Sequence, residues 1–247
     1  MKKLIGLLGL SLILFAACKE DNLVVVEDIP PTDNIDVTLL TYYGEEPIKY
    51  DSIYTNSQGV QFYIDSVGLL VDNIIFNPAD SEESIDTAKN WIHLDNTWPR
   101  GKGGLIPAGG YYGQFEVRYG GDSILVDDIQ ELNKLDPTLV RRDGLGVNFF
   151  TIKGRIFDPS KPPTDSVFLP VQYTLGTFFL ADTAVSETRY FSVDNSQNIA
   201  IFLLANVKPI LHHVNLAAVQ EVKSDFFDNQ DWTIAEIMRD SLQIGVF

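Results

Sequence analysis

From about residue 35 onward, apolar residues recur mainly at every second position, which is the period of a half-buried β-strand. The segment Gly-Val-Gln-Phe-Tyr-Ile-Asp-Ser-Val at 59–67 alternates in this way, and the pattern continues through Phe76. Clusters of Gly, Pro, Asn and Asp separate such segments and mark turns. The strands predicted in this way are 36–43, 59–67, 67–76, 112–119, 146–156, 166–180 and 189–204.

Repeated short strands with turn signals between them are typical of an antiparallel sandwich or barrel. We therefore expect an all-β fold, an antiparallel β-sandwich with a few short helices, that forms a single domain over residues 36–247. Residues 77–89 are acidic and contain residues that interrupt regular structure, so an exposed loop is expected there.

Three short segments carry the helical period instead. In 126–134 we expect Ile129 and Leu132 to point inward, and 207–216 is a second short candidate. The strongest candidate is 231–242, with Asp231 as its N-cap. The residues expected on the inner side of this third helix are Ile234, Ile237, Met238 and Leu242.

The first 17 residues have the pattern of a signal peptide, with Lys2 and Lys3 ahead of an apolar stretch that ends in two alanines. The apolar stretch is too short for a membrane-spanning helix. The only cysteine of the chain, Cys18, follows at once. We expect cleavage before Cys18 and lipidation of its thiol, which would make 18–35 a membrane-anchored tether. The alternative is an ordinary signal peptide with a chance cysteine.

The three residues after the cysteine are Lys19, Glu20 and Asp21. They resemble the surface-export signal of lipoproteins in one large group of Gram-negative bacteria, although a solvated charged linker is the alternative. The resemblance implies a protein anchored in the outer membrane by its lipid and exposed at the cell surface. With a single cysteine the exported domain has no internal disulfide, so it must be held together by core burial.

The chain has 18 Lys and Arg against 34 Asp and Glu. Loss of Lys2 and Lys3 with the signal peptide leaves 16 against 34, a net charge of −18. Such a surface repels phosphates, which excludes DNA and RNA as partners. It is also repelled by anionic headgroups, so the membrane is expected to be a partner only through the lipid.

The order of several motifs carries a family resemblance. These motifs are 59–74, 91–98, Gly113-Gln114-Phe115 followed by Leu135-Asp136-Pro137, 149–154 and 234–247. In this order they resemble the MbnP-like family, named for a protein encoded beside methanobactin biosynthesis genes. The resemblance covers about residues 36–247 and implies a copper-binding function, as in some members.

Two departures argue against that function. Where the family usually has a Met and Trp pair, this chain has Thr-Leu-Val-Arg-Arg-Asp-Gly-Leu-Gly at 138–146, and Thr174 stands where the family tends to carry a His. The three histidines, His93, His212 and His213, offer little else, because adjacent residues point in different directions and His93 is expected to pack within a strand. We therefore expect no metal and no cofactor, with copper disfavoured.

Acidic residues near the first predicted helix are a further candidate for binding a cation. They are Asp122, Asp127, Asp128 and Glu131. We expect a solvated turn and helix face here rather than a metal site.

No nucleophile, phosphate loop or metalloprotease motif occurs, and thiol catalysis is excluded beyond Cys18. A pair of carboxylates for glycoside cleavage depends on distances that a sequence does not contain. Trp91, Trp98, Tyr111 and Tyr112 flank a glycine-rich loop at 101–110. Such aromatics can stack on sugars or bind a protein, and the alternative is that they belong to the core.

We therefore expect a non-catalytic binding or structural lipoprotein, not an enzyme, whose partner beyond the membrane is a glycan or a protein. The alternatives are a copper-binding protein and a surface glycosidase.

Overall fold

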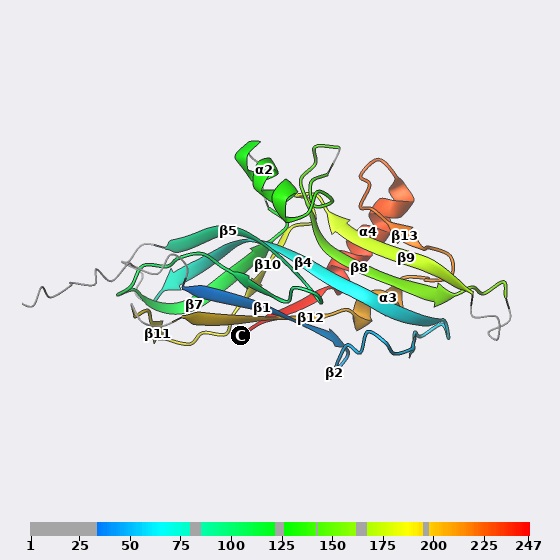
Figure 1. Ribbon diagram of the computed structural model, residues 1–247, viewed down its shortest axis with the longest axis horizontal. Helices are drawn as coiled ribbons and strands as arrows, with labels where there is room; N and C mark the ends of the chain where they lie inside the picture. The colour runs from blue at the N-terminus through cyan, green and yellow to red at the C-terminus, as the bar shows by residue number, and fades with distance from the viewer. Residues whose placement is uncertain (1–33, 80–84, 122–125, 142, 162–166, 195–197) are drawn as a thin grey trace, which may run out of the picture. The chain divides into compact units, whose positions relative to one another are not determined.

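The longest strand, β4 (Gln61–Pro78), organises the larger of two sheets in the computed structural model (Figure 1). The structure describes residues 34–79, 85–121, 126–141, 143–161, 167–194 and 198–247. Contacts group Pro31–Phe247 as one compact unit. The predicted signal peptide and the segment from Cys18 to Asp21 lie outside the described residues, so the expectations for them stay predictions. None of the described helices is long and apolar enough to cross a membrane.

The two predicted strands 59–67 and 67–76 form one continuous strand, β4. Different strands pair with its first and second halves. β8 (Asn148–Phe157) pairs with residues 62–69 of β4, and β7 (Tyr111–Tyr119) pairs with residues 71–78. β5 (Asp86–Asp95) pairs with residues 68–76. The middle of β4, Val67 to Val71, is fully buried, which indicates that both faces of the strand are covered there.

The described strands form two sheets. The larger runs in the order β10–β7–β4–β8–β9–β13, with β3 and β5 on β4 and β11 on β7. Its remaining members are β3 (Tyr54–Thr55), β9 (Phe168–Gly176), β10 (Asp182–Val185), β11 (Phe191–Ser192) and β13 (Glu221–Val222). The smaller runs β14–β12–β1–β2 with β6 on β1. Its members are β1 (Ile35–Tyr43), β2 (Glu46–Pro47), β6 (Arg100–Lys102), β12 (Ile199–Asn206) and β14 (Gln243–Val246).

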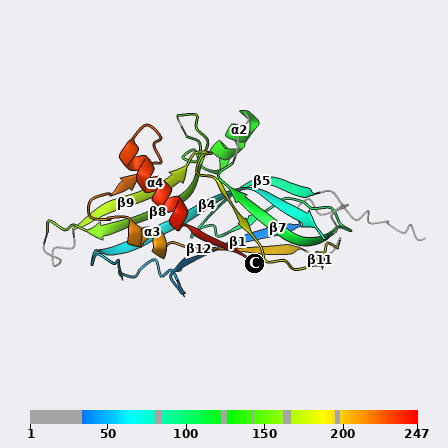
Figure 2. The same cartoon turned by 180° about the vertical axis from the view of Figure 1, so that it is seen from behind.

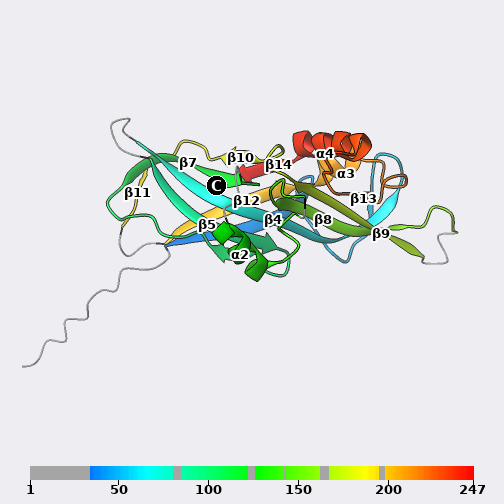
Figure 3. The same cartoon turned by 90° about the horizontal axis from the view of Figure 1, so that it is seen from above.

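Apolar side chains from both sheets form one core. Gly103 lies where Ile35 of β1 meets Ile74 of β4, since a Cβ on that glycine would come within 2.6 and 2.9 Å of their side chains. At one edge the sheets approach each other, with β14 next to β10 (Figure 3). The prediction of an all-β sandwich with short helices is confirmed, with 48% of the described residues in strands and 14% in helices.

Two strand pairs depart from the antiparallel arrangement. β1 pairs with β12 in parallel, and β13 pairs with β9 in parallel. Parallel neighbours need a long connection, and here about 160 residues separate Ile35 from its partner Ile199. The sheets are therefore mixed.

The helices of the described part are α2 (Val126–Leu135), α3 (Lys208–His213) and α4 (Asn229–Ser241), and α3 packs beside α4 (Figure 2). The N-cap of α4 is Asp228 rather than Asp231: its Oδ1 accepts hydrogen bonds from the N–H groups of Gln230 at 2.9 Å and Asp231 at 3.2 Å. Asp231 instead accepts from the N–H of Lys223 at 2.9 Å.

Two residues predicted to face inward are exposed, Ile129 by 37% and Ile237 by 41%. In α4 the buried stripe is Ala235, Met238 and Ser241, spaced by three, which leaves Ile237 at its margin. In α2, Leu132 is buried, as expected.

The loop predicted at 77–89 is shorter than expected, because β5 begins at Asp86. Ala88 is 3% exposed and packs in the core, and the hydroxyl of Tyr112 donates to the carboxylate of Asp86. Asp86 can therefore begin a strand because the buried Tyr112 donates a hydrogen bond to its carboxylate. The acidic composition of the segment gives no sign of this partner.

Candidate functional site

The structure does not bring together the four aromatic residues expected to bind a ligand. Trp91 and Tyr112 are 6% and 1% exposed, and the Trp91 indole N–H donates to Asp128 at 3.2 Å. Trp98 and Tyr111 are 72% and 49% exposed. Side chains alternate between the faces of a strand, so Trp91 points away from its buried neighbour Ile92 and is covered by α2, whereas Tyr112 packs against Phe76 and Phe191 in the core. Burial removes these two as ligand contacts, whereas binding by Trp98 and Tyr111 stays a prediction.

The acidic residues near α2 are not all solvated. Asp128 is 7% exposed and accepts the indole N–H of Trp91, whereas Glu131 is exposed as expected. The side chain of Asp127 lies outside the part that the structure describes. Asp122 lies outside the described residues.

The three histidines have separate surroundings. A ring nitrogen of His212 lies 3.1 Å from the Tyr43 hydroxyl, and Nδ1 of His213 lies 2.8 Å from Oγ of Ser241. His93 is half-buried on β5. Within the described ranges, no group of three or more His, Cys, Asp or Glu side chains is placed to hold a metal ion.

Two buried residues hold a left-handed backbone. Thr177 (φ 72°) and Ser224 (φ 54°) are the non-glycine residues with positive φ in the part of the chain that the structure describes, and both are 0% exposed. Such a conformation costs about 1–3 kcal/mol and persists only where the surroundings enforce it, often at functional sites. It therefore points to the two loops that contain these residues, after β9 and after β13.

A pair of exposed phenylalanines follows each strained residue. Phe178 and Phe179 follow Thr177, and Phe226 and Phe227 come just after Ser224. Together with Trp232 of α4 these four residues form what we call the aromatic platform. Their exposed fractions are 38% for Phe178, 48% for Phe179, 45% for Phe226 and 81% for Phe227.

The rings of the platform touch one another across the two loops. Phe179 stacks on Phe226 with ring centroids 5.3 Å apart and an interplanar angle of 23°. Trp232 meets Phe226 edge-on at 5.1 Å, and Phe178 lies 4.2 Å from Phe179. Contiguous exposed apolar surface is a common feature of interaction sites, so the aromatic platform is a candidate site.

Arg141 holds in place the loop that carries Phe226 and Phe227. Its side chain is only 8% exposed, and it donates to the backbone carbonyls of Lys223 at 2.7 Å and Ser224 at 3.1 Å. It also forms an ion pair with Asp143. Burial acts to raise the pKa of Asp143, but the hydrogen bonds from Arg141 and from the N–H of Leu145 outweigh it, so the pKa lies below its usual value.

A polar groove opens beside the platform and shares Phe227 with it. Its volume is about 620 Å³. The other residues of the polar groove are Pro137, Thr138, Val140, Arg141, Asp143, Asn148, Gln172, Thr174, Lys223 and Asp225. The groove therefore offers amide, hydroxyl, ammonium and carboxylate groups within reach of one exposed ring.

A smaller cavity of about 190 Å³ continues the groove, sharing Thr138 and Thr174 and adding His93, Asp136 and Lys153. Burial acts to raise the pKa of Asp136. The N–H and hydroxyl of Thr138, both donating at 2.8 Å, together with nearby His93 and Lys153, lower it further than burial raises it. Asp136 is therefore a carboxylate at neutral pH and a hydrogen-bond acceptor.

Sequence reasoning did not predict this site, although it singled out some of the residues that line it. Thr174 and the segment 138–146, noted as departures from the family pattern, both line the groove. The aromatic platform was missed. Its sequence signal is a Phe-Phe pair at 178–179 and another at 226–227, each interrupting strand alternation next to a turn.

The sequence matches no protein-family model and no curated protein. Among solved structures it is similar to MbnP from Methylosinus trichosporium, with 10% sequence identity and a TM-score of 0.44. The alignment covers 78% of this chain and 81% of that chain. A likeness this distant carries no argument about function, so the resemblance to the MbnP-like family stays a prediction.

Proposed function

We propose that the folded domain is a non-catalytic binding module that takes a glycan on the aromatic platform and in the polar groove. The observation that carries this proposal is the position of Phe227, which belongs to the platform, lines the groove and is 81% exposed. A ligand that stacks on the Phe227 ring would therefore lie next to the polar side chains of the groove.

A sugar ring has the matching chemistry. Its C–H faces are apolar and stack on an exposed aromatic ring, while its hydroxyls both donate and accept hydrogen bonds. In the groove, Asn148 and Gln172 provide amide groups that do both, and Asp225 and Lys223 provide an acceptor and a donor. Charges of both signs line the groove, which favours a neutral sugar over an acidic one.

Two acids of this region, Asp136 and Asp143, are suited to binding rather than to hydrolysis. Glycoside cleavage needs one carboxyl that stays protonated near neutral pH, which requires a raised pKa. Asp136 and Asp143 instead have pKa values below the usual value, because hydrogen bonds and nearby cations stabilise their ionised forms. Each is suited to accept a hydroxyl hydrogen bond.

The site of action in this proposal is the outer face of the outer membrane, with the chain anchored through a lipid on Cys18. This part rests on the sequence pattern that ends at Cys18 and on the charged residues that follow it.

The direct test is calorimetric titration of the protein with four neutral probes: cellohexaose, xylohexaose, mannohexaose and maltohexaose. We expect at least one to bind and to be recovered uncut after prolonged incubation. Binding of none at millimolar concentration would contradict the proposal and favour a protein partner for the platform. Cleavage of a bound probe would favour the glycosidase instead.

A further inference from the structure

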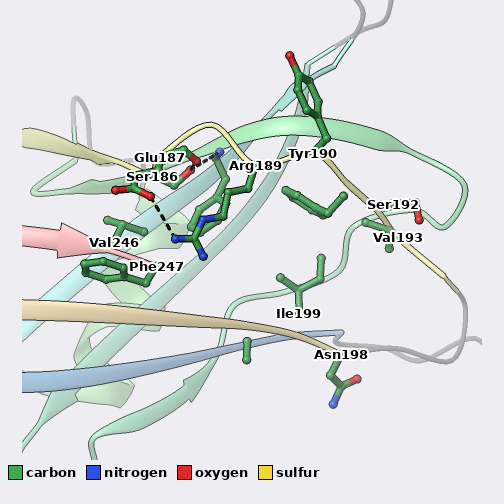
Figure 4. Close-up of a pocket in the computed structure, with 13 residues that line it drawn as sticks. Ser186, Glu187, Arg189, Tyr190, Ser192, Val193, Asn198, Ile199, Val246 and Phe247 are labelled. Atoms are coloured by element: carbon green, nitrogen blue, oxygen red, sulfur yellow. Dashed lines mark hydrogen bonds and ion pairs between the residues drawn. The ribbon is translucent and has the colours of Figure 1, made fainter.

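Another cavity lies between the two sheets, near the start of β12 (Figure 4). Its volume is about 440 Å³. Apolar side chains from both sheets form most of its surface: Phe115, Phe191, Val193, Ile199 and Val246. We call it the inter-sheet cleft. It is separate from the aromatic platform and shares no residue with the polar groove.

One wall of the inter-sheet cleft is a strand edge. The N–H of Ile199 donates to the carbonyl of Asn34 at 2.8 Å, on the β1 side of β12. Phe202 exchanges both backbone hydrogen bonds with Phe247, at 2.9 and 3.0 Å, on the β14 side. Successive residues of a strand direct their backbone groups to alternate edges. The N–H and C=O of Ala200 therefore point to the β14 side.

The pairing of β14 with β12 covers Leu203 to Asn206, and the bonds of Phe247 extend it to Phe202. Ala200 lies two residues further along, is exposed, and lines the inter-sheet cleft. A strand placed in the cleft would thus meet a donor and an acceptor already oriented for a sheet hydrogen bond.

We propose that the inter-sheet cleft binds an extended peptide segment of a partner protein, which adds to the edge of β12 in line with β14. Strand addition of this kind uses backbone hydrogen bonds for affinity and alternate side chains for specificity. Here Ala200 supplies the backbone pair, and the apolar floor receives every second side chain of the peptide. A small apolar molecule would fill the floor but leave the N–H and C=O of Ala200 to water.

Charged groups of the protein determine which peptide charge is favoured. Arg189 and Glu187 form an ion pair at 3.1 Å, with both side chains about three-quarters exposed, so the pair contributes little and opens readily. In Figure 4 the Arg189 side chain extends over the cleft toward Val246, whereas Tyr190 points away. Without its signal peptide the chain would have 16 basic against 34 acidic residues, a net charge of −18, so a neutral or basic peptide is favoured.

The test begins with a library of random twelve-residue peptides displayed on phage and selected on the purified protein. A selected peptide is then synthesised and titrated against the parent, Ala200→Pro and Ala200→Val. Proline removes the N–H that faces the cleft without touching the ladder to β1, and such a residue is tolerated on a strand edge. Valine keeps the N–H and is the matched control.

We expect selected peptides to alternate apolar and polar residues, to bind Ala200→Pro at least tenfold more weakly than the parent, and to bind Ala200→Val within about twofold. Peptide binding should also slow hydrogen exchange of the Ala200 N–H in the unaltered protein, which tests the contact even if the proline variant misfolds. Failure to select a peptide, equal binding to Ala200→Pro, or unchanged exchange at Ala200 would each overturn the proposal.

Discussion

The hydroxyl of Ser224 donates a 2.7 Å hydrogen bond to the carbonyl of Thr174, and the same oxygen accepts from the N–H of Gly176 at 3.2 Å. This joins the loop after β13 to the end of β9. It explains how Ser224 keeps a left-handed backbone while fully buried, and it holds the two halves of the aromatic platform together.

Substitutions at Ser224 separate the hydrogen bonds from the backbone strain. Ser224→Ala loses both bonds and keeps the strain, so we expect it to lower the free energy of unfolding by about 1–3 kcal/mol. Ser224→Gly loses the same bonds but relieves the strain, since glycine adopts positive φ freely, and should be about 1 kcal/mol more stable than Ser224→Ala. Urea denaturation of the two variants measures this difference. A glycine variant less stable than the alanine variant would show that the backbone is not strained.

Asp143 makes stability depend on pH. Its folded pKa lies below the unfolded value of about 3.9, so its ionised form stabilises the fold above about pH 4, and this contribution is lost as pH falls through the folded pKa. We expect Asp143→Asn to lower the free energy of unfolding by about 1 kcal/mol at pH 7, because it removes the ion pair with Arg141.

Denaturation series at several pH values check this expectation, with Asp51→Asn as a control at an exposed acid. The difference between Asp143→Asn and the parent should shrink toward zero in acid. A difference that is independent of pH would mean that the charge of Asp143 is not the cause.

The predicted lipid anchor depends on Cys18 alone, since it is the single cysteine of the chain. Cys18→Ala should leave the precursor uncleaved or release the protein from membranes, because no other residue can carry the acyl chains. Partition into a detergent phase measures this. Partition of the variant equal to that of the parent would refute lipidation at Cys18.

Surface export is a separate expectation and needs its own variant. Replacement of Lys19, Glu20 and Asp21 by alanine should keep the anchor but remove accessibility to protease in intact cells. Unchanged accessibility would show that these residues are only a linker.

Titration of the tag-free mature domain with Cu(I) and Cu(II) should reveal no stoichiometric site of submicromolar affinity. Copper needs imidazole or sulfur ligands that converge. Here His212 and His213 are hydrogen-bonded to Tyr43 and Ser241, and Met238 is buried in the core. A tight site lost on changing His93 or His212 would restore the function that the family resemblance implies.

Local pattern was sufficient for most strands, because alternation such as that of Ile35, Val37 and Leu39 indicates which face is buried. It did not reveal the parallel pairing of β1 with β12, since partners about 160 residues apart leave no local signal. It also failed for Trp91 and Tyr112, whose chemistry suits a ligand but whose position in the strand places them in the core.

The site was harder to predict for a related reason. Phe179, Phe226 and Trp232 come from three different segments and meet only because Ser224 and Arg141 tie their loops together. Two Phe-Phe pairs beside turns were visible in the sequence, but no periodicity indicated that they would share one surface.

The most direct test of glycan binding compares Phe227→Ala with Phe202→Ala, using the hexasaccharide that binds the parent most tightly. Phe202 is also exposed, by 42%, but lies on β12 outside the platform and the groove. An aromatic contact is worth about 0.5–1.5 kcal/mol beyond area burial, and 1.4 kcal/mol is tenfold in affinity. We predict that Phe227→Ala weakens binding about tenfold while Phe202→Ala changes it by less than about twofold. Equal affinities of the two variants would contradict the account.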